Sequence, residues 1–244
     1  MTKNVIVAID PSYHCTGITI VELNENNACE KYHFFRVMYD KAKTKTGKPY
    51  KPRPVKNIND YVYTMPTNID VNDIIIDEED ENNAEQCEVT LKSMMSSQKI
   101  YQACIDVLSK LKNLDNIYIA LENYIMPSFN GKNNLKNVSG LIILQGLIRR
   151  NLIMYAIKEN IKIKLLTPTP KTVKSKFSYN GDADKDMMVN CFINDYDGAQ
   201  LIPEIKNLSV DAINDVVDSF AIAWYAYGKI IKKINGFDEE NNAR

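Results

Sequence analysis

Two acidic residues each follow a short apolar run of the kind that forms a buried strand. Asp10 comes directly after residues 4–9, and Glu122 comes directly after residues 117–121. Acidic residues are depleted within strands, so neighbouring strands of this kind would end with two carboxylates side by side. Close carboxylates repel each other unless a cation or a proton lies between them. The pair therefore indicates a cation site, although an Asp-Pro turn after a strand is also common.

Two further acids lie near the start of an expected C-terminal helix. Asp215 and Asp218 are three residues apart, just before the apolar segment 220–227, and this spacing places them on one helical face. An acidic first turn also has a simpler explanation, because negative charge there complements the helix dipole. Asp211, four residues before Asp215, shares the face and is an alternative ligand.

Four carboxylates from three elements would form an oxygen-rich site without histidine. Such ligands suit Mg²⁺, with Mn²⁺ as a substitute, better than Zn²⁺. Two ions about 3.5–4 Å apart can activate an attacking water and stabilise the leaving oxygen of a phosphodiester. This chemistry needs no nucleophilic side chain, so the same four residues are the predicted metal ligands and catalytic residues: Asp10, Glu122, Asp215 and Asp218.

A sheet and a helix must bring these acids together, and the apolar patterning predicts both. Three successive strand-like segments predict an antiparallel meander, and the later alternation of helices and strands predicts parallel βαβ units. The expected fold class is α/β, with a mixed five-stranded sheet flanked by helices. The expected strands are 4–9, 16–23, 31–38, 117–121 and 161–166, and the expected helices are 92–112, 138–157, 169–176, 184–195 and one from 210 or 214 to 232.

The chain is expected to form one domain over residues 1–236, with an insertion at about 39–89 and a polar tail at 237–244. The insertion is first basic and proline-containing and then strongly acidic. Such a composition is typical of a partly disordered segment, and it would also suit a flexible arm that contacts DNA.

The overall composition is that of an ordinary globular protein, with 45% apolar and 25% charged residues. The net charge is -1, so any surface for nucleic acid must be a local basic patch. Five cysteines form no C-x-x-C pair and there are two histidines, a pattern that disfavours structural zinc and suggests reduced thiols in a cytoplasmic setting. No uninterrupted apolar run approaches the ~18 residues needed to cross a membrane.

Four segments in order resemble the RuvC family of Holliday junction resolvases, within the RNase H-like nuclease fold. Each segment alone is weakly specific, whereas four in the same order are more so. Together they cover most of the chain outside residues 39–89. The segments are IVAIDPSYHCTGITIVE (6–22), IALENYIM (119–126), TPKTVKSKFSYNGDADKDMMV (169–189) and NDVVDSFAIAWYAY (214–227).

The resemblance implies an RNase H-like fold and carries the four acids onto the metal-binding positions of the family. It also implies a homodimer that uses two Mg²⁺ ions per site and nicks two strands of a four-way junction symmetrically. Two departures concern the Asp-Pro turn, where Ser12 replaces a glycine, and the aromatic residue after the glutamate, which falls at Tyr124 while Ile125 takes its usual place. The long segment 39–89 suggests a divergent phage or viral member.

A lysine-rich segment is the predicted DNA surface. Lysines with interleaved aromatics, here Phe177 and Tyr179, suit a groove that follows phosphates. A solvated helix face is the alternative explanation. The predicted DNA-binding residues are Lys171, Lys174, Lys176, Lys185 and Tyr124, with Lys185 the strongest candidate for a phosphate contact near the acids.

The predicted activity is that of a crossover junction endodeoxyribonuclease acting in DNA recombination or repair, in the cytoplasm or in a viral replication compartment. One alternative is a less selective nuclease of the same fold that cuts forks, flaps or three-way DNA. Another is a catalytically silent protein that binds junctions. An actin-like ATPase or sugar kinase fits less well, because Pro11 and Ser12 stand where such proteins need glycines.

Overall fold

The computed structural model describes residues 3–12, 14–40, 54–64, 81–123 and 135–234. Their strands form one six-stranded sheet in the order β4-β3-β2-β1-β5-β6. β1 pairs antiparallel with β2, and β2 with β3, while β5 and β6 run parallel to β1. The strands are β1 (Lys3–Asp10), β2 (Cys15–Leu23), β3 (Cys29–Tyr39), β4 (Ile58–Tyr63), β5 (Leu114–Leu121) and β6 (Lys162–Leu166).

The expected α/β arrangement of three antiparallel strands extended by parallel strands is confirmed, but the sheet has six strands rather than five. The added strand, β4, pairs parallel with β3 at the sheet edge and lies inside the segment expected to be an insertion. Its sequence, INDYVY, is too polar and too short to stand out by itself. Burial of Ile58 and Tyr63 and an ion pair from Asp60 to β3 stabilise it, and these contacts are tertiary.

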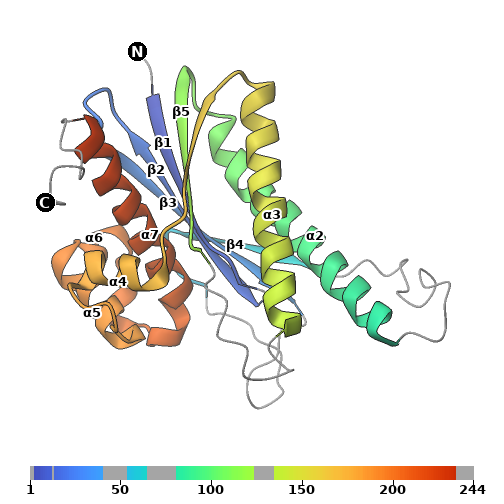
Figure 1. Ribbon diagram of the computed structural model, residues 1–244. Coiled ribbons are helices and arrows are strands. Elements are labelled where there is room, and N and C mark those ends of the chain that lie inside the picture. The colour runs from blue at the N-terminus through green and yellow to red at the C-terminus, as the bar shows by residue number, and fades with distance from the viewer. Residues whose placement is uncertain (1–2, 13, 41–53, 65–80, 124–134, 235–244) are drawn as a thin grey trace, which may run out of the picture.

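Helices cover both faces of the sheet (Figure 1). The two longest helices apart from α7 cover one face: α2 (Glu81–Leu108) and α3 (Leu135–Lys158), which pack on each other. α2 begins earlier than expected, inside the segment 39–89, and it approaches α3 closely because small residues such as Ser93 face it. The other layer contains α4 (Pro170–Ser178), α5 (Lys185–Asp195), α6 (Gly198–Leu201), the short helix η2 (Ile205–Asn207) and α7 (Val210–Ile234).

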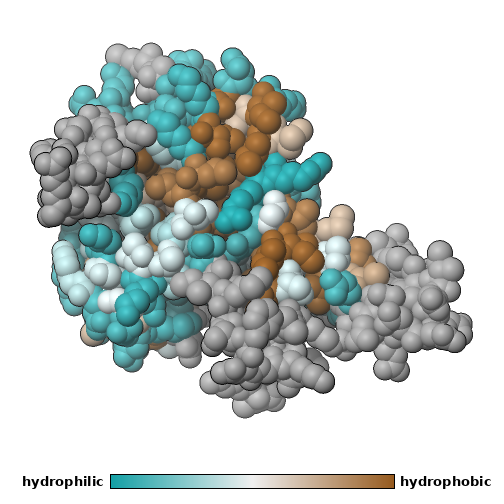
Figure 2. All heavy atoms as spheres, viewed as in Figure 1, coloured by the Kyte–Doolittle hydropathy of each residue, from teal (hydrophilic) through white to brown (hydrophobic). Residues whose placement is uncertain are grey.

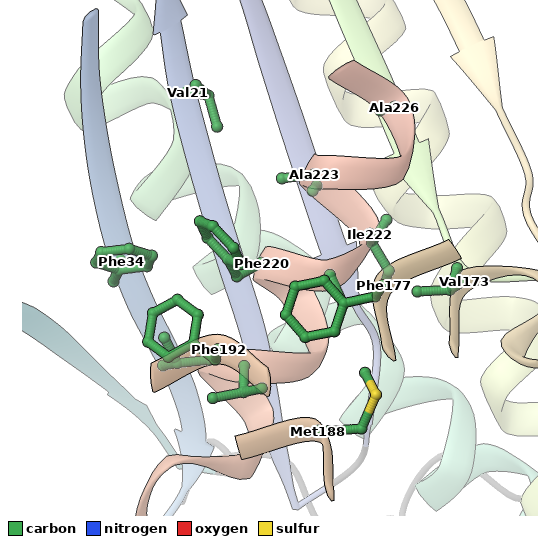
Figure 3. Close-up of a cluster of buried hydrophobic side chains, with 14 of the residues drawn as sticks. Val21, Phe34, Val173, Phe177, Met188, Phe192, Phe220, Ile222, Ala223 and Ala226 are labelled. Carbon is green, nitrogen blue, oxygen red and sulfur yellow. The ribbon is translucent and has the colours of Figure 1, made fainter. Parts of the chain in front are cut away.

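The core on the α7 side holds that helix against the strands. Phe220 of α7 points toward β2 and β3, and it lies among Phe34, Phe177 and Phe192 (Figure 3). The ring centroids of Phe192 and Phe220 lie 4.7 Å apart, and the two rings pack edge to face. Burying one such side chain stabilises a fold by about 1.5–3 kcal/mol. The position of α7 over the sheet is therefore fixed in part by this packing.

The core on the other side contains the inner face of α3. By length and composition alone, Val138–Lys158 is apolar enough to cross a membrane. Three of its residues, Leu144, Ile148 and Leu152, are buried in the cluster formed with the sheet and α2. An apolar composition of this kind also suits a helix that contributes to a core.

Candidate active site

The ends of β1 and β5 bring two of the predicted acids next to each other. The strands are parallel neighbours with Ile9 opposite Leu121, and the amide nitrogen of Glu122 lies 3.5 Å from the Ile9 carbonyl oxygen. Asp10 is the next residue of β1. Side chains alternate along a strand, and Ala8 and Ala120 belong to the core on the α7 side. Asp10 and Glu122 therefore face α7.

A close contact between β2 and α7 brings the other two acids over this strand end. Gly17 stands opposite Asp10 in the sheet, and a Cβ on Gly17 would lie 1.7 Å from the carbonyl oxygen of Asp215. One turn further along α7, the buried hydroxyls of Ser219 and Thr19 share a hydrogen bond of 2.8 Å. Asp215 and Asp218 are thereby held over the carboxyl end of β1.

The electrostatics of the four acids show that they interact. Burial raises the pKa of Asp10 well above its ordinary value, and the carboxylates of Asp218, Glu122 and Asp215 raise it further. Burial, followed by Asp218, raises the pKa of Glu122 to about 7. Each carboxylate therefore resists ionisation beside the others, and a bound cation would remove that conflict.

The two helical acids have raised pKa values as well. Burial raises the pKa of Asp218 to about 6, against an opposing effect of the Lys185 ammonium. Burial raises the pKa of Asp215, although a hydrogen bond from the Cys15 thiol and the charge of Lys185 pull it back. The four acids are thus partly buried at this end of the sheet, and Lys185 lies close enough to lower the pKa of three of them.

The carboxylate oxygens are not gathered around one point. Across the part of the chain that the structure describes, no three acidic, histidine or cysteine side chains form a ready-made metal-ligand group. Coulomb effects extend beyond ligand distances, so the mutual pKa shifts and this finding agree: the acids lie within electrostatic reach of one another without forming a ligand group. All-oxygen donors of this kind fit a hard divalent cation once the carboxylates rotate toward it.

The predicted lysines divide into two pairs. The half-buried Lys174 donates to the carbonyl oxygen of Ala183 at 2.7 Å and lowers the pKa of Glu122 and Asp218. Lys185, the first residue of α5, lowers the pKa of Asp10, Asp215 and Asp218. These two amines therefore flank the acids.

The other predicted DNA contacts lie apart from the acids or cannot be placed. Lys171 and Lys176 are exposed, and Lys171 lies 3.6 Å from exposed Asp182. Phe177 is fully buried and belongs to the core, whereas Tyr179 is 83% exposed. The expectation that both aromatics serve the DNA surface thus fails for Phe177. Tyr124 and the side chain of Asp211 lie outside the described residues.

Sequence reasoning missed two buried polar side chains near the acids, Arg36 and Gln145. Arg36 of β3 is 1% exposed and forms an ion pair with Asp60 of β4. Gln145 of α3 donates to the Glu122 carbonyl oxygen at 2.9 Å and so holds the end of β5. The available signal was Arg36 itself, a charged residue within the apolar run of β3.

No protein-family model matches this sequence, and no curated protein is significantly similar to it. By structure the chain is similar to the yeast mitochondrial Holliday junction resolvase, with 11% identity and a TM-score of 0.47 over 95% of this chain and 83% of that chain. It is also similar to Thermus thermophilus RuvC in complex with a Holliday junction substrate, with 11% identity and a TM-score of 0.42 over 96% and 97%.

A third similar structure is the human cytomegalovirus terminase nuclease domain, with 15% identity and a TM-score of 0.39 over 91% of this chain and 82% of that chain. At these identities and TM-scores the likeness concerns the course of the chain. Which residues act, and on what, has to be argued from the acids and lysines of this chain.

Proposed function

We propose that this protein is a metal-dependent endonuclease for branched DNA, with Asp10, Glu122, Asp215 and Asp218 as its metal ligands. The observation that carries the proposal is that four carboxylates, at the ends of β1 and β5 and on α7, lie within electrostatic reach of one another, each with a pKa raised by burial. Close carboxylates repel one another when ionised, and the binding of a divalent cation between them would relieve this repulsion.

The acidic and basic residues have different proposed roles. The four carboxylates hold two Mg²⁺ or Mn²⁺ ions, which when bound supply Lewis-acid activation of water and stabilise the leaving oxygen. Lys174 and Lys185 offset the negative charge of the acids and attract a phosphate to the same place. Lys171 and Lys176, exposed on α4, extend this positive surface along the DNA backbone.

The proposed substrate is a four-way junction, nicked symmetrically by a homodimer during recombination or repair, in the cytoplasm or a viral replication compartment. A dimer needs an apolar contact surface, and α3 with the neighbouring β6 offers one, seen as brown areas in Figure 2. Its exposed apolar side chains include Ile142, Met154, Ile157 and Leu165, each 45–66% exposed. Patches of this kind mark interaction sites.

The test is incubation of the full chain with a synthetic four-way junction and Mg²⁺, with the nicks mapped at nucleotide resolution. Asp10→Asn and Glu122→Gln should each lose cleavage while junction binding survives, because the ligands change and the lysines remain. Retention of full Mg²⁺-dependent cutting by either variant would overturn the site assignment.

Three further substrates separate the alternatives within the same experiment. Equal cutting of three-way, flap and four-way DNA would indicate a less selective nuclease. This alternative is considered because the aromatic residue after Glu122 falls at Tyr124, one position earlier than in the RuvC family pattern. Tight junction binding without nicks under Mg²⁺ or Mn²⁺ would indicate a catalytically silent binding protein.

A further inference from the structure

A row of four residues, three of them charged, crosses the sheet at the level of Asp10. The register places Asp10 opposite Gly17, Gly17 opposite Arg36, and Arg36 opposite Asp60. All four face α7, because their neighbours two positions earlier or later, such as Ala8, Phe34 and Ile58, belong to the core on that side. The row therefore connects the edge strand β4 to the acids at the end of β1.

Arg36 is the central contact of this row. Its Nε and Nη2 donate to the two carboxylate oxygens of Asp60 at 2.8 and 2.9 Å, and its Nη1 donates to the Ala212 carbonyl oxygen at 2.8 Å. A planar guanidinium held bidentately has little freedom, so Asp60 sets the direction in which Nη1 points. The side chain is almost wholly buried, where an arginine is tolerated only with such partners.

Ala212 lies in the first turn of α7, three residues before Asp215. The Arg36 contact thus fixes the start of the helix from the β3 side, next to the place where Gly17 of β2 contacts Asp215 itself. A small rotation of this turn would carry the carboxylates of Asp215 and Asp218 away from Asp10. The beginning of α7 is therefore held in place by a polar contact that reaches it from the sheet edge.

We propose that Arg36 and Asp60 are positioning residues for the metal-binding acids, and that β4 serves the active site by supplying Asp60. This inference rests on the proposed function and deepens it. Outer groups that orient metal ligands typically contribute about 10–100-fold to metal affinity. Loss of the pair should therefore weaken the binding of metal more than the binding of DNA.

The experiment compares wild type with Asp60→Asn and with the double variant Arg36→Met/Asp60→Leu. Arg36 is buried and Asp60 is partly exposed, so replacing both by apolar residues of similar size leaves no unpaired charge, and such replacements are often neutral for stability. Asp115→Asn is the control, because it removes the carboxylate of an exposed ion pair with Lys162 at 3.6 Å, near the start of β5 and at the opposite end of that strand from Glu122. Mn²⁺ binding without DNA is measured by electron paramagnetic resonance, together with thermal melting, junction affinity and Mn²⁺-dependent cleavage.

The double variant should melt cooperatively, bind the junction like wild type and need about tenfold more Mn²⁺ for half-saturation. Asp60→Asn should shift in the same direction by less, and Asp115→Asn should match wild type. The Asp60 side chain is 24% exposed, so Asp60→Asn should disturb folding less than the double variant does. If the double variant does not fold, the Mn²⁺ affinity of Asp60→Asn tests the inference. Wild-type Mn²⁺ affinity in a folded Asp60→Asn or double variant overturns this inference, whereas wild type that neither binds Mn²⁺ nor cuts overturns the proposed function.

Discussion

Gly17 lies directly against the backbone of Asp215, and a Cβ at position 17 would come within 1.7 Å of the Asp215 carbonyl oxygen. Gly17 is also the residue opposite Asp10 in the sheet. The absence of a side chain at this one position therefore sets the spacing between the sheet and α7 where the acids meet.

The first prediction concerns this spacing. Gly17→Ala should destabilise the protein by about 1–3 kcal/mol, as overpacking typically does, and should lower Mg²⁺-dependent cleavage, because α7 has to move away from β1. Chemical denaturation and single-turnover kinetics measure both effects.

Gly146→Ala is the control for that substitution. Nothing lies within 4 Å of a Cβ built on Gly146 of α3, and alanine favours a helix over glycine by up to about 1 kcal/mol. We therefore expect unchanged or higher stability and normal cleavage. A Gly17→Ala protein as stable and active as the Gly146→Ala protein would contradict the role assigned to the close contact.

The second prediction concerns the buried hydrogen bond between Thr19 and Ser219, which are both fully buried. Ser219→Ala leaves the Thr19 hydroxyl without this partner and should cost about 1–3 kcal/mol of unfolding free energy. The double variant Thr19→Val/Ser219→Ala should cost less than the sum of the single variants. Denaturant titration of all four proteins measures the coupling, and strict additivity would show that this hydrogen bond does not tie α7 to β2.

The third prediction concerns pH. The pKa of Glu122 is raised from 4.5 to about 7 and that of Asp218 from 3.8 to about 6, in both cases first by burial. At pH values between the ordinary pKa of each group and its raised pKa, the folded protein holds a proton that the unfolded chain has lost. The metal-free protein should therefore lose stability as pH rises through this range. Its melting temperature in EDTA should therefore fall from about pH 5 to pH 7.

Added metal should reverse this trend. Because the ligands must lose their protons, the rise in melting temperature caused by Mg²⁺ should grow with pH, and binding should release protons. Calorimetry in two buffers of different ionisation enthalpy counts those protons. Glu122→Gln should release fewer, and equal release would remove Glu122 from the set of metal ligands.

The fourth prediction concerns the lysines. Exposed Lys176 and Lys185 are expected to contact phosphates, so alanine at either position should reduce the slope of log affinity against log salt concentration by about 1. Lys110→Ala is the control, since Lys110 follows α2, on the opposite face of the sheet from α4 and α5. An unchanged salt slope in both Lys176→Ala and Lys185→Ala would place the DNA elsewhere on the protein.

The sequence by itself predicted most of the local elements and singled out the acids as candidates. The period of apolar residues predicted β1, β2, β3, β5 and β6 and the main helices, because a buried face imposes that period on any amphipathic or buried element. Asp10 and Glu122 could be singled out because each directly follows an apolar strand-like run, and acids are depleted within strands. That their strands are neighbours was a condition of the sequence argument, and the structure meets it by pairing β1 with β5.

Only the tertiary structure decided which groups support those acids. β4 carries no strong apolar pattern, and it exists as a strand because Asp60 meets Arg36 and because Ile58 and Tyr63 are buried. The burial of Phe177, the inward direction of Lys174 and the contact between Gly17 and Asp215 likewise depend on residues far away in the chain. Strand register and close packing are set by residues that are distant in the sequence and close in space. A local sequence pattern therefore does not predict them.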